Sequence, residues 1–172
     1  MIISLTGFMG VGKSTISERL SKHLYCKVVD LDRYIEHNEG LSVKDIFRIK
    51  GEPYFRIKEE FYLNQLLTEN REKVLVLSLG GGTLISSINQ KLIKEKTFCI
   101  YLKASPETMI RRLSRSKKTR PGIEGLSADE FIKGIEALFE IRREGYEYCN
   151  SLIIDVDNRS VKDMLAEIIN AI

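Results

Sequence analysis

Short apolar runs separated by longer helical segments repeat along the whole chain. The runs predict five strands, at residues 2–6, 27–30, 74–78, 98–103 and 152–155. Most of these runs are nearly continuous and do not alternate apolar with polar positions, a pattern typical of strands that are buried on both faces. We therefore expect a central parallel sheet.

The intervening segments carry the periodicity and the end signals of helices. They predict helices at about 13–24, 31–39, 42–50, 52–69, 87–94, 106–114, 127–148 and from 160 onward. Two helix starts have clear signals: Pro106 stands in a first turn, where its missing N–H is tolerated, and Ser127 with Glu130 forms a capping box. Strands separated by helices predict a three-layer α/β/α sandwich whose ligands bind beyond the carboxyl ends of the strands.

Composition limits the kind of protein and the compartment that can be expected, but it indicates no particular reaction. The 172 residues suit one domain spanning 1–172, and the net charge of +3 is too small to indicate a nucleic-acid partner. No apolar stretch approaches the roughly 20 residues of a membrane span, and the N-terminal run lacks the features of a signal peptide. Cys26, Cys99 and Cys149 lie far apart, which favours free thiols in a reducing compartment. We expect a cytoplasmic monomer that binds small molecules and neither nucleic acid nor membrane.

A glycine-rich segment joins the first strand to the first helix. Residues 7–14 read GFMGVGKS and match GxxxxGK[ST] in the strand–loop–helix setting that this phosphate-binding motif (the P-loop) needs. Its backbone N–H groups and the helix N-terminus would cradle phosphate oxygens, with the lysine on the β- and γ-phosphates and the serine hydroxyl on Mg²⁺. The alternative is a chance glycine-rich turn. We expect ATP to contact Gly10, Val11, Gly12, Lys13, Ser14 and Thr15.

Two carboxylates follow the second strand, and they have a functional and a structural explanation. Asp30 and Asp32 stand two residues apart and could face a ligand together. One could hold Mg²⁺, directly or through water, while the other accepts a proton from an attacking hydroxyl. The structural alternative is that both only cap the following helix.

Other candidates for an acceptor site are equally open when each is taken alone. Arg56 stands one turn before Glu59, so the two could form a surface ion pair. Arg142 could be a solvated arginine beside Arg143. The triple glycine at 80–82 could be a plain loop, although three glycines there would let a ligand approach bare backbone.

Together these segments resemble one family over essentially the whole chain, the shikimate kinases of the nucleoside-monophosphate-kinase-like P-loop class. Motif order and spacing both agree with that family. The resemblance is carried by the P-loop, by Asp30 and Asp32 with Ile35 and Glu36, by the stretch from Ile46 through Gly51, Glu52, Phe55 and Arg56 to Glu59, by the triple glycine, and by Arg142 with Tyr146.

The resemblance implies transfer of the γ-phosphate of ATP to the 3-hydroxyl of shikimate, giving shikimate 3-phosphate and ADP for chorismate and aromatic amino-acid biosynthesis. The acceptor would bind in a helical region at about 31–70. By resemblance, Asp32 binds the shikimate hydroxyls and acts as the base, and Asp30 supports Mg²⁺. Arg56 and Arg142 clamp the carboxylate, a task suited to guanidinium forks. Gly80, Gly81 and Gly82 offer backbone to the substrate, and Glu59 orients Arg56.

Basic residues crowd the segment before Pro121, which could be a solvated loop. In a phosphotransferase such a loop is better explained as a lid, here at about 112–126, which excludes water and brings an arginine onto the developing charge. The resemblance implies that this catalytic arginine, which also contacts ATP, is Arg120. Either Arg112 or Arg115 would lie near the nucleotide, and Arg159 would lie in the loop that packs on adenine.

The chain departs from the family pattern at two places. Gly122 follows Pro121 where the family usually has Leu, and Glu144 with Gly145 stands where it usually has Pro. The first change bears on lid motion and the second on the pose of Arg142.

Two rival functions follow from the same residues. One is another kinase of this fold, acting on gluconate or on a nucleoside monophosphate, but no base-binding pocket can be recognised. The other is a nucleotide-dependent switch without an acceptor, which would leave the paired carboxylates and arginines idle.

Overall fold

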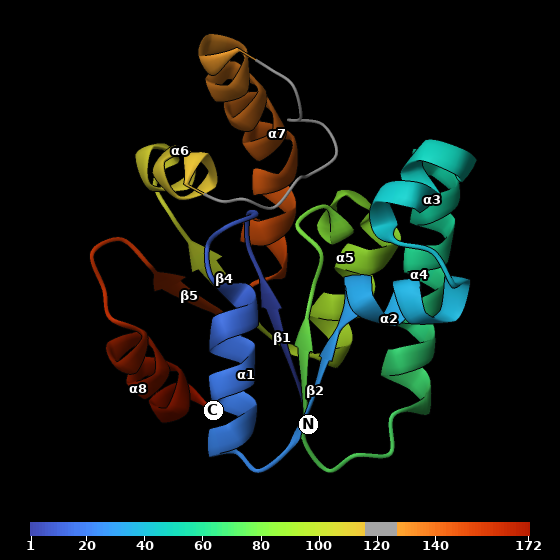
Figure 1. Ribbon diagram of the computed structural model, residues 1–172. Coiled ribbons are helices and arrows are strands. Elements are labelled where there is room, and N and C mark those ends of the chain that lie inside the picture. Colours follow the sequence, from blue (N-terminus) through green and yellow to red (C-terminus); the bar gives the residue numbers. More distant parts are fainter. Residues whose placement is uncertain (116–126) are drawn as a thin grey trace.

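Five parallel strands form the centre of the molecule in the order β2-β3-β1-β4-β5 (Figure 1). The computed structural model describes residues 1–115 and 127–172. The strands are β1 (Ile2–Thr6), β2 (Lys27–Asp30), β3 (Leu75–Ser78), β4 (Phe98–Lys103) and β5 (Leu152–Asp155). The predicted parallel sheet and all five predicted strands are confirmed, with only the start of β3 one residue later.

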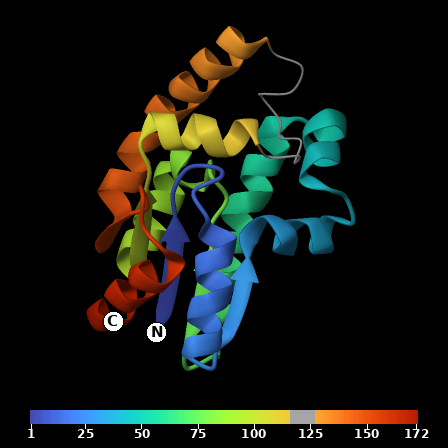
Figure 2. The same cartoon turned by 60° about the vertical axis from the view of Figure 1, so that its left-hand side comes forward.

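Helices cover both faces of this sheet. They are α1 (Lys13–His23), α2 (Leu31–Glu39), α3 (Val43–Lys50), α4 (Glu52–Glu69), α5 (Ser87–Lys96), α6 (Pro106–Ser114), α7 (Ala128–Cys149) and α8 (Val161–Ala171). In Figures 1 and 2, α1 and α8 lie on one face, while α5 and the end of α7 lie on the other. Helices α2, α3 and α4 form a cluster beside the β2–β3 edge, in the region predicted to bind the acceptor. The three-layer architecture is therefore confirmed.

The sequence sets most helix starts through capping side chains. The hydroxyls of Ser42, Ser86, Ser105, Ser127 and Ser160 each accept a hydrogen bond from the backbone N–H three residues later, at the starts of α3, α5, α6, α7 and α8. These bonds satisfy N–H groups that the first turn of a helix leaves without partners. The capping box of Ser127 and Glu130 is present as predicted.

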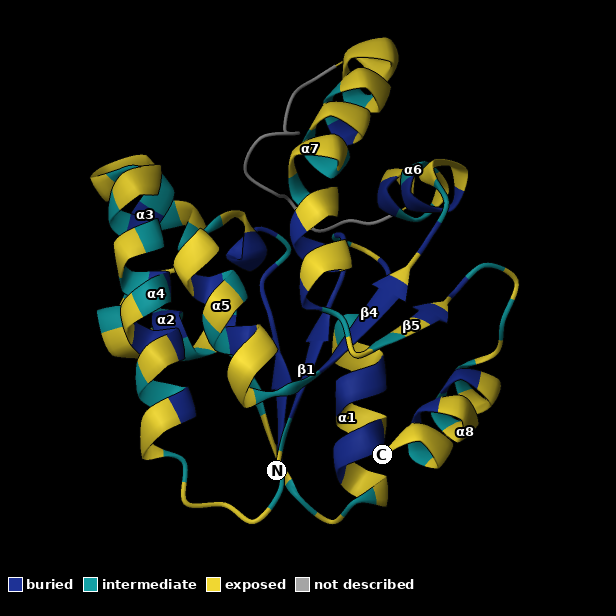
Figure 3. Ribbon diagram, turned by 180° about the vertical axis from the view of Figure 1, so that it is seen from behind, coloured by how far each residue is buried: buried dark blue, intermediate teal, exposed yellow. Residues whose placement is uncertain are grey.

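The core lies between the sheet and these helices. All four residues of β3 are buried, as are the last four of β1, whereas the edge strands β2 and β5 keep exposed positions. Figure 3 shows the buried strands in dark blue and the outer helix surfaces in yellow. Within the described residues, no helix is long and apolar enough to cross a membrane.

One short helix was not predicted, the 3-10 helix η1 (Thr83–Ile85) directly after the triple glycine. Helix α7 packs against it at Gly145, which is buried. A Cβ atom at Gly145 would lie 2.2 Å from the carbonyl oxygen of Leu84. The glycine that departs from the family pattern is therefore the point at which α7 approaches the backbone of η1.

Gly145→Ala should lower the free energy of unfolding by about 1–3 kcal/mol, because the added methyl group overlaps backbone that cannot rotate away. The higher helix propensity of alanine would offset only part of this loss. Chemical denaturation of the variant measures the effect. Glu144→Ala, an exposed change in the same turn, should stay within about 0.5 kcal/mol of the parent protein. A Gly145→Ala protein as stable as the parent would contradict the close contact.

Candidate active site

The P-loop has the backbone that a phosphate cradle requires. Gly7, Gly10 and Gly12 take φ angles of 138°, 81° and 104°, a region that residues with a side chain rarely adopt. Gly12 is the N-cap of α1, so the helix begins at Lys13 with its N–H groups directed at the loop. The Nζ of Lys13 donates to the carbonyl oxygens of Gly7 and Phe8, at 2.7 and 3.0 Å. The motif therefore occurs at the carboxyl end of β1, where its function needs it.

Ser14 and Asp30 line one hollow beside this loop. The carboxylate of Asp30 also accepts the N–H of Arg33 at 3.2 Å, so Asp30 is the N-cap of α2. No cluster of three or more acidic, histidine or cysteine ligands occurs in the described part of the chain. Mg²⁺ at a nucleotide typically uses one or two protein ligands and takes the rest from phosphate and water. A hydroxyl and a carboxylate facing one hollow fit that pattern.

A cavity of about 580 Å³ lies next to the P-loop, between the acceptor-region helices and α7. Its volume is within the range of small-molecule sites. Its polar lining comprises Asp32, Glu52, Arg56, Glu59 and Arg142, together with the three glycines at 80–82. The structure thus brings together Asp32, Arg56, Arg142 and the triple glycine, from segments more than 100 residues apart, whereas Asp30 lines the hollow beside Ser14.

Asp32 differs from Asp30 in its structural role. It lies within the first turn of α2 and does not cap that helix. Burial, together with the negative charges of Glu59 and Asp30, raises the pKa of Asp32 to about 7, while Lys13 acts in the opposite direction. A carboxylate in this setting is a stronger base than an ordinary aspartate. Of the two alternatives for the pair, capping is therefore observed for Asp30 only.

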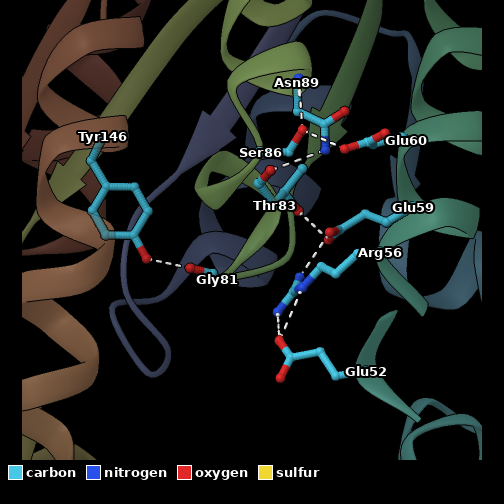
Figure 4. Close-up of polar contacts among 9 residues, drawn as sticks. All are labelled: Glu52, Arg56, Glu59, Glu60, Gly81, Thr83, Ser86, Asn89 and Tyr146. Atoms are coloured by element: carbon cyan, nitrogen blue, oxygen red, sulfur yellow. Dashed lines mark hydrogen bonds and ion pairs between the residues drawn. The ribbon is translucent and has the colours of Figure 1, made fainter. Parts of the chain in front are cut away.

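Arg56 is fixed on α4 by two carboxylates (Figure 4). Its Nη1 donates to Glu59 at 2.8 Å, and its Nε and Nη2 donate to Glu52 at 3.1 and 2.9 Å. Glu59 is buried and also accepts the hydroxyl of Thr83 at 2.7 Å. Burial lowers the pKa of Arg56, but the two glutamates more than compensate and hold it above its usual value. The ion pair between Arg56 and Glu59 that the sequence suggested is present, but it lies in the wall of the cavity and not on the open surface.

Arg142 enters the cavity from α7. Its Nε is buried and has no hydrogen-bond partner within the described residues. Burial lowers the pKa of Arg142, and its guanidinium lies 5.5 Å from the ring centre of Phe8. A partly buried guanidinium group whose Nε has no hydrogen-bond partner among the described residues favours an anionic ligand in the cavity.

Tyr146, one turn after Arg142, supports this wall. Its hydroxyl donates to the carbonyl oxygen of Gly81 (Figure 4), and its ring packs 5.2 Å from that of Tyr101. The sequence contained Tyr146 as part of a motif but gave no role for it. Thr83 and Glu52 were also missed as partners, because single polar residues in a helix or after a loop carry no pattern of their own.

The triple glycine has a structural reason in addition to the predicted approach of substrate. A Cβ atom would lie 2.7 Å from Asp32 Oδ1 at Gly80, 3.3 Å from Arg142 Nη1 at Gly81, and 2.6 Å from Arg56 Nη2 at Gly82. Each glycine therefore makes room for a different functional side chain.

The remaining predicted residues lie on the nucleotide side or outside the described chain. Arg112 donates to the carbonyl oxygens of Val11 and Val156, at 2.9 and 3.4 Å, and so joins the P-loop to the loop after β5. Arg115 is exposed, and Arg159 pairs with Glu167 on α8 at 2.7 Å. Arg120 and most of the predicted lid lie outside the described residues.

Comparisons with known proteins agree on one family. The sequence profile of the family described as shikimate kinase matches residues 9–172. A shikimate kinase of Thermus thermophilus is 38% identical over 167 residues, which cover 97% of this chain and 87% of that protein. The solved structure of a shikimate kinase from Acinetobacter baumannii in complex with shikimate matches with a TM-score of 0.88 at 29% identity, covering 98% of this chain and 90% of that one.

More distant neighbours share only the fold. A gluconokinase from Sinorhizobium meliloti 1021 has a TM-score of 0.57 and 16% identity, covering 98% of this chain and 89% of that one. This gluconokinase, a representative of the rival function, is thus similar to the chain in fold alone. The chain belongs to the shikimate kinase family.

Proposed function

We propose that this chain transfers the γ-phosphate of ATP to the 3-hydroxyl of shikimate, giving shikimate 3-phosphate and ADP. The observation that carries the proposal is the cavity beside the P-loop, which is lined by Arg56 and Arg142 together with Asp32, a carboxylate whose pKa is raised. A small ring compound that carries one carboxylate and several hydroxyls suits this set of groups. We also propose that the enzyme acts in the cytoplasm, as a monomer.

On the donor side, the P-loop would bind the phosphates of ATP through its N–H groups and through Lys13. Lys13 would leave the carbonyl oxygens of Gly7 and Phe8 when a stronger acceptor, the β- or γ-phosphate, is present. Arg112 would contact the nucleotide, since it lies between the P-loop and the loop after β5. Arg159 would stay near the adenine side, and Arg120 would bring a positive charge to the transferred group.

On the acceptor side, Arg56 and Arg142 would bind the carboxylate of shikimate. Asp32 would accept hydrogen bonds from the ring hydroxyls and take the proton of the 3-hydroxyl as it attacks the γ-phosphorus. Gly80, Gly81 and Gly82 would let the ring lie close to the backbone. Positioning and electrostatic stabilisation would supply most of the rate enhancement, as is general for phosphoryl transfer.

Mg²⁺ would be held by Ser14 and, directly or through water, by Asp30. When bound, it neutralises negative charge on the β- and γ-phosphates. Asp30 can serve in this way while it caps α2, because a carboxylate has two oxygens and several lone pairs.

The direct test is ADP release by the purified chain with ATP and Mg²⁺, in the presence of shikimate, gluconate or a panel of nucleoside monophosphates. A large increase with shikimate alone is expected. An increase with another acceptor only would keep the P-loop assignment and reject the acceptor. Slow release that no acceptor alters would favour the nucleotide-dependent switch.

Arg142→Ala should raise the KM for shikimate by roughly thirtyfold or more while changing the KM for ATP little, because it removes a partly buried cation from the carboxylate site. Steady-state kinetics with each substrate varied in turn measures both constants. Arg143→Ala is the matched control, since Arg143 is exposed and pairs only with Glu140 and Glu147 on its own helix, within the described residues. Equal effects on the two KM values in Arg142→Ala would contradict the assignment.

Asp32→Asn should lower kcat by roughly 10²- to 10⁴-fold, the usual contribution of a positioned base, and should leave ATP binding largely intact. Asp45→Asn makes the same chemical change on the exposed surface of α3, where Asp45 pairs with Arg48, and should not change kcat. Single-turnover measurement of phosphate transfer separates the chemical step from product release. A kcat within a few fold of the parent value in Asp32→Asn would remove the base from the mechanism.

A further inference from the structure

One edge of the Arg56 guanidinium is already bonded to a carboxylate of the protein. Oε1 of Glu52 accepts hydrogen bonds from both Nε and Nη2, at 3.1 and 2.9 Å (Figure 4). These two donors lie side by side and form one of the forks through which arginine binds a carboxylate group. Glu52 also lines the cavity in which the acceptor would bind.

The two carboxylates on Arg56 differ in how firmly they are held. The side chain of Glu59 is 1% exposed and has a second bond from Thr83, so leaving Arg56 would strand a buried charge. The side chain of Glu52 is 56% exposed and stands in the first turn of α4. It can move into water at little cost, because exposed ion pairs contribute little net stability.

The charges that line the cavity also favour release of Glu52. The cavity lining holds three acidic residues, Asp32, Glu52 and Glu59, against the two arginines, Arg56 and Arg142. An acceptor carboxylate would add a further negative charge beside these acids. Release of Glu52 into water as the acceptor carboxylate arrives would offset that charge, and Glu52 is the exposed one of the two glutamates on Arg56.

We propose that Glu52 is the internal counter-ion of the acceptor clamp, and that the carboxylate of the acceptor displaces it from Arg56. This inference rests on the proposed function. Glu52 keeps the guanidinium oriented between turnovers, and it makes binding an exchange of one carboxylate for another. It is a specificity-determining residue because a neutral polyol has no anion with which to take its place.

The exchange is tested by Glu52→Gln, which removes the negative charge and keeps the size of the side chain. Isothermal titration calorimetry with shikimate, without nucleotide, should give a dissociation constant roughly two- to fivefold lower than for the parent protein, the factor that matches loss of one exposed ion pair. The methyl ester of shikimate, which is neutral, should show no such gain. Thermal unfolding of the variant verifies that it is folded.

Glu60→Gln is the matched control on the same helix. It makes the same change of charge, but Glu60 lies outside the cavity and accepts a hydrogen bond from the hydroxyl of Ser86 at 2.5 Å (Figure 4). A glutamine can still accept that bond. Shikimate should bind to Glu60→Gln as it binds to the parent protein.

Three results would overturn the proposal. Unchanged or weaker binding of shikimate to Glu52→Gln would mean that Glu52 remains on Arg56 and supports the bound acceptor. An equal gain in Glu60→Gln would indicate a general effect of charge, and an equal gain for the methyl ester would show that no carboxylate exchange is involved. Failure of the proposed function is a separate outcome, visible as absence of shikimate binding and of shikimate-dependent ADP release in the parent protein.

Discussion

The buried carboxylate of Glu59 ties the acceptor side of the cavity together. It lies almost entirely out of water and bonds to Arg56 from its own helix and to Thr83 from the loop after β3. Loss of either bond would leave a desolvated charge incompletely paired, which costs several kcal/mol in typical proteins. Thr83 in turn accepts a hydrogen bond from Asn89 of α5 through its carbonyl oxygen, at 3.0 Å. Helix α4 is therefore joined to the loop after β3, and Arg56 is held in place in the cavity wall.

The two halves of the site are built by different means. The phosphate half is made of backbone, and its shape follows from three glycines and the start of one helix within a single short segment. The acceptor half is made mainly of side chains that come from α2, α3, α4 and α7, together with the glycine loop after β3. Its geometry depends on packing between elements that are distant in sequence, such as the hydrogen bond of Tyr146 to Gly81. A phosphate site of this kind can be recognised from one motif, whereas an acceptor site cannot.

This difference explains how far the sequence could be interpreted. Strands, helix starts and the P-loop depend on local patterns, so the apolar runs and the serine caps located them closely. The resemblance to a family identified Asp32, Arg56 and Arg142 together as acceptor-site candidates. Taken singly, each of these residues also had a plain structural explanation. The resemblance already implied different roles for Asp30 and Asp32, but the residues alone left open whether both cap α2, and only the structure shows that Asp30 caps it while Asp32 lines the cavity. The partnership of Thr83 with Glu59 spans 24 residues and has no signal in the sequence.

The three glycines after β3 limit how such an enzyme could be re-engineered. Each abuts a different polar group of the cavity, Asp32, Arg142 or Arg56, so a side chain introduced there would crowd one of these groups, most severely at Gly80 and Gly82. The apolar part of the cavity lining includes Val43 and Phe47 from α3 and Leu138 and Ile141 from α7. Apolar walls tolerate changes of volume far better than polar contacts tolerate displacement. A variant that accepts a bulkier ring acid should therefore be sought by trimming Phe47 or Ile141, with the glycine wall left untouched.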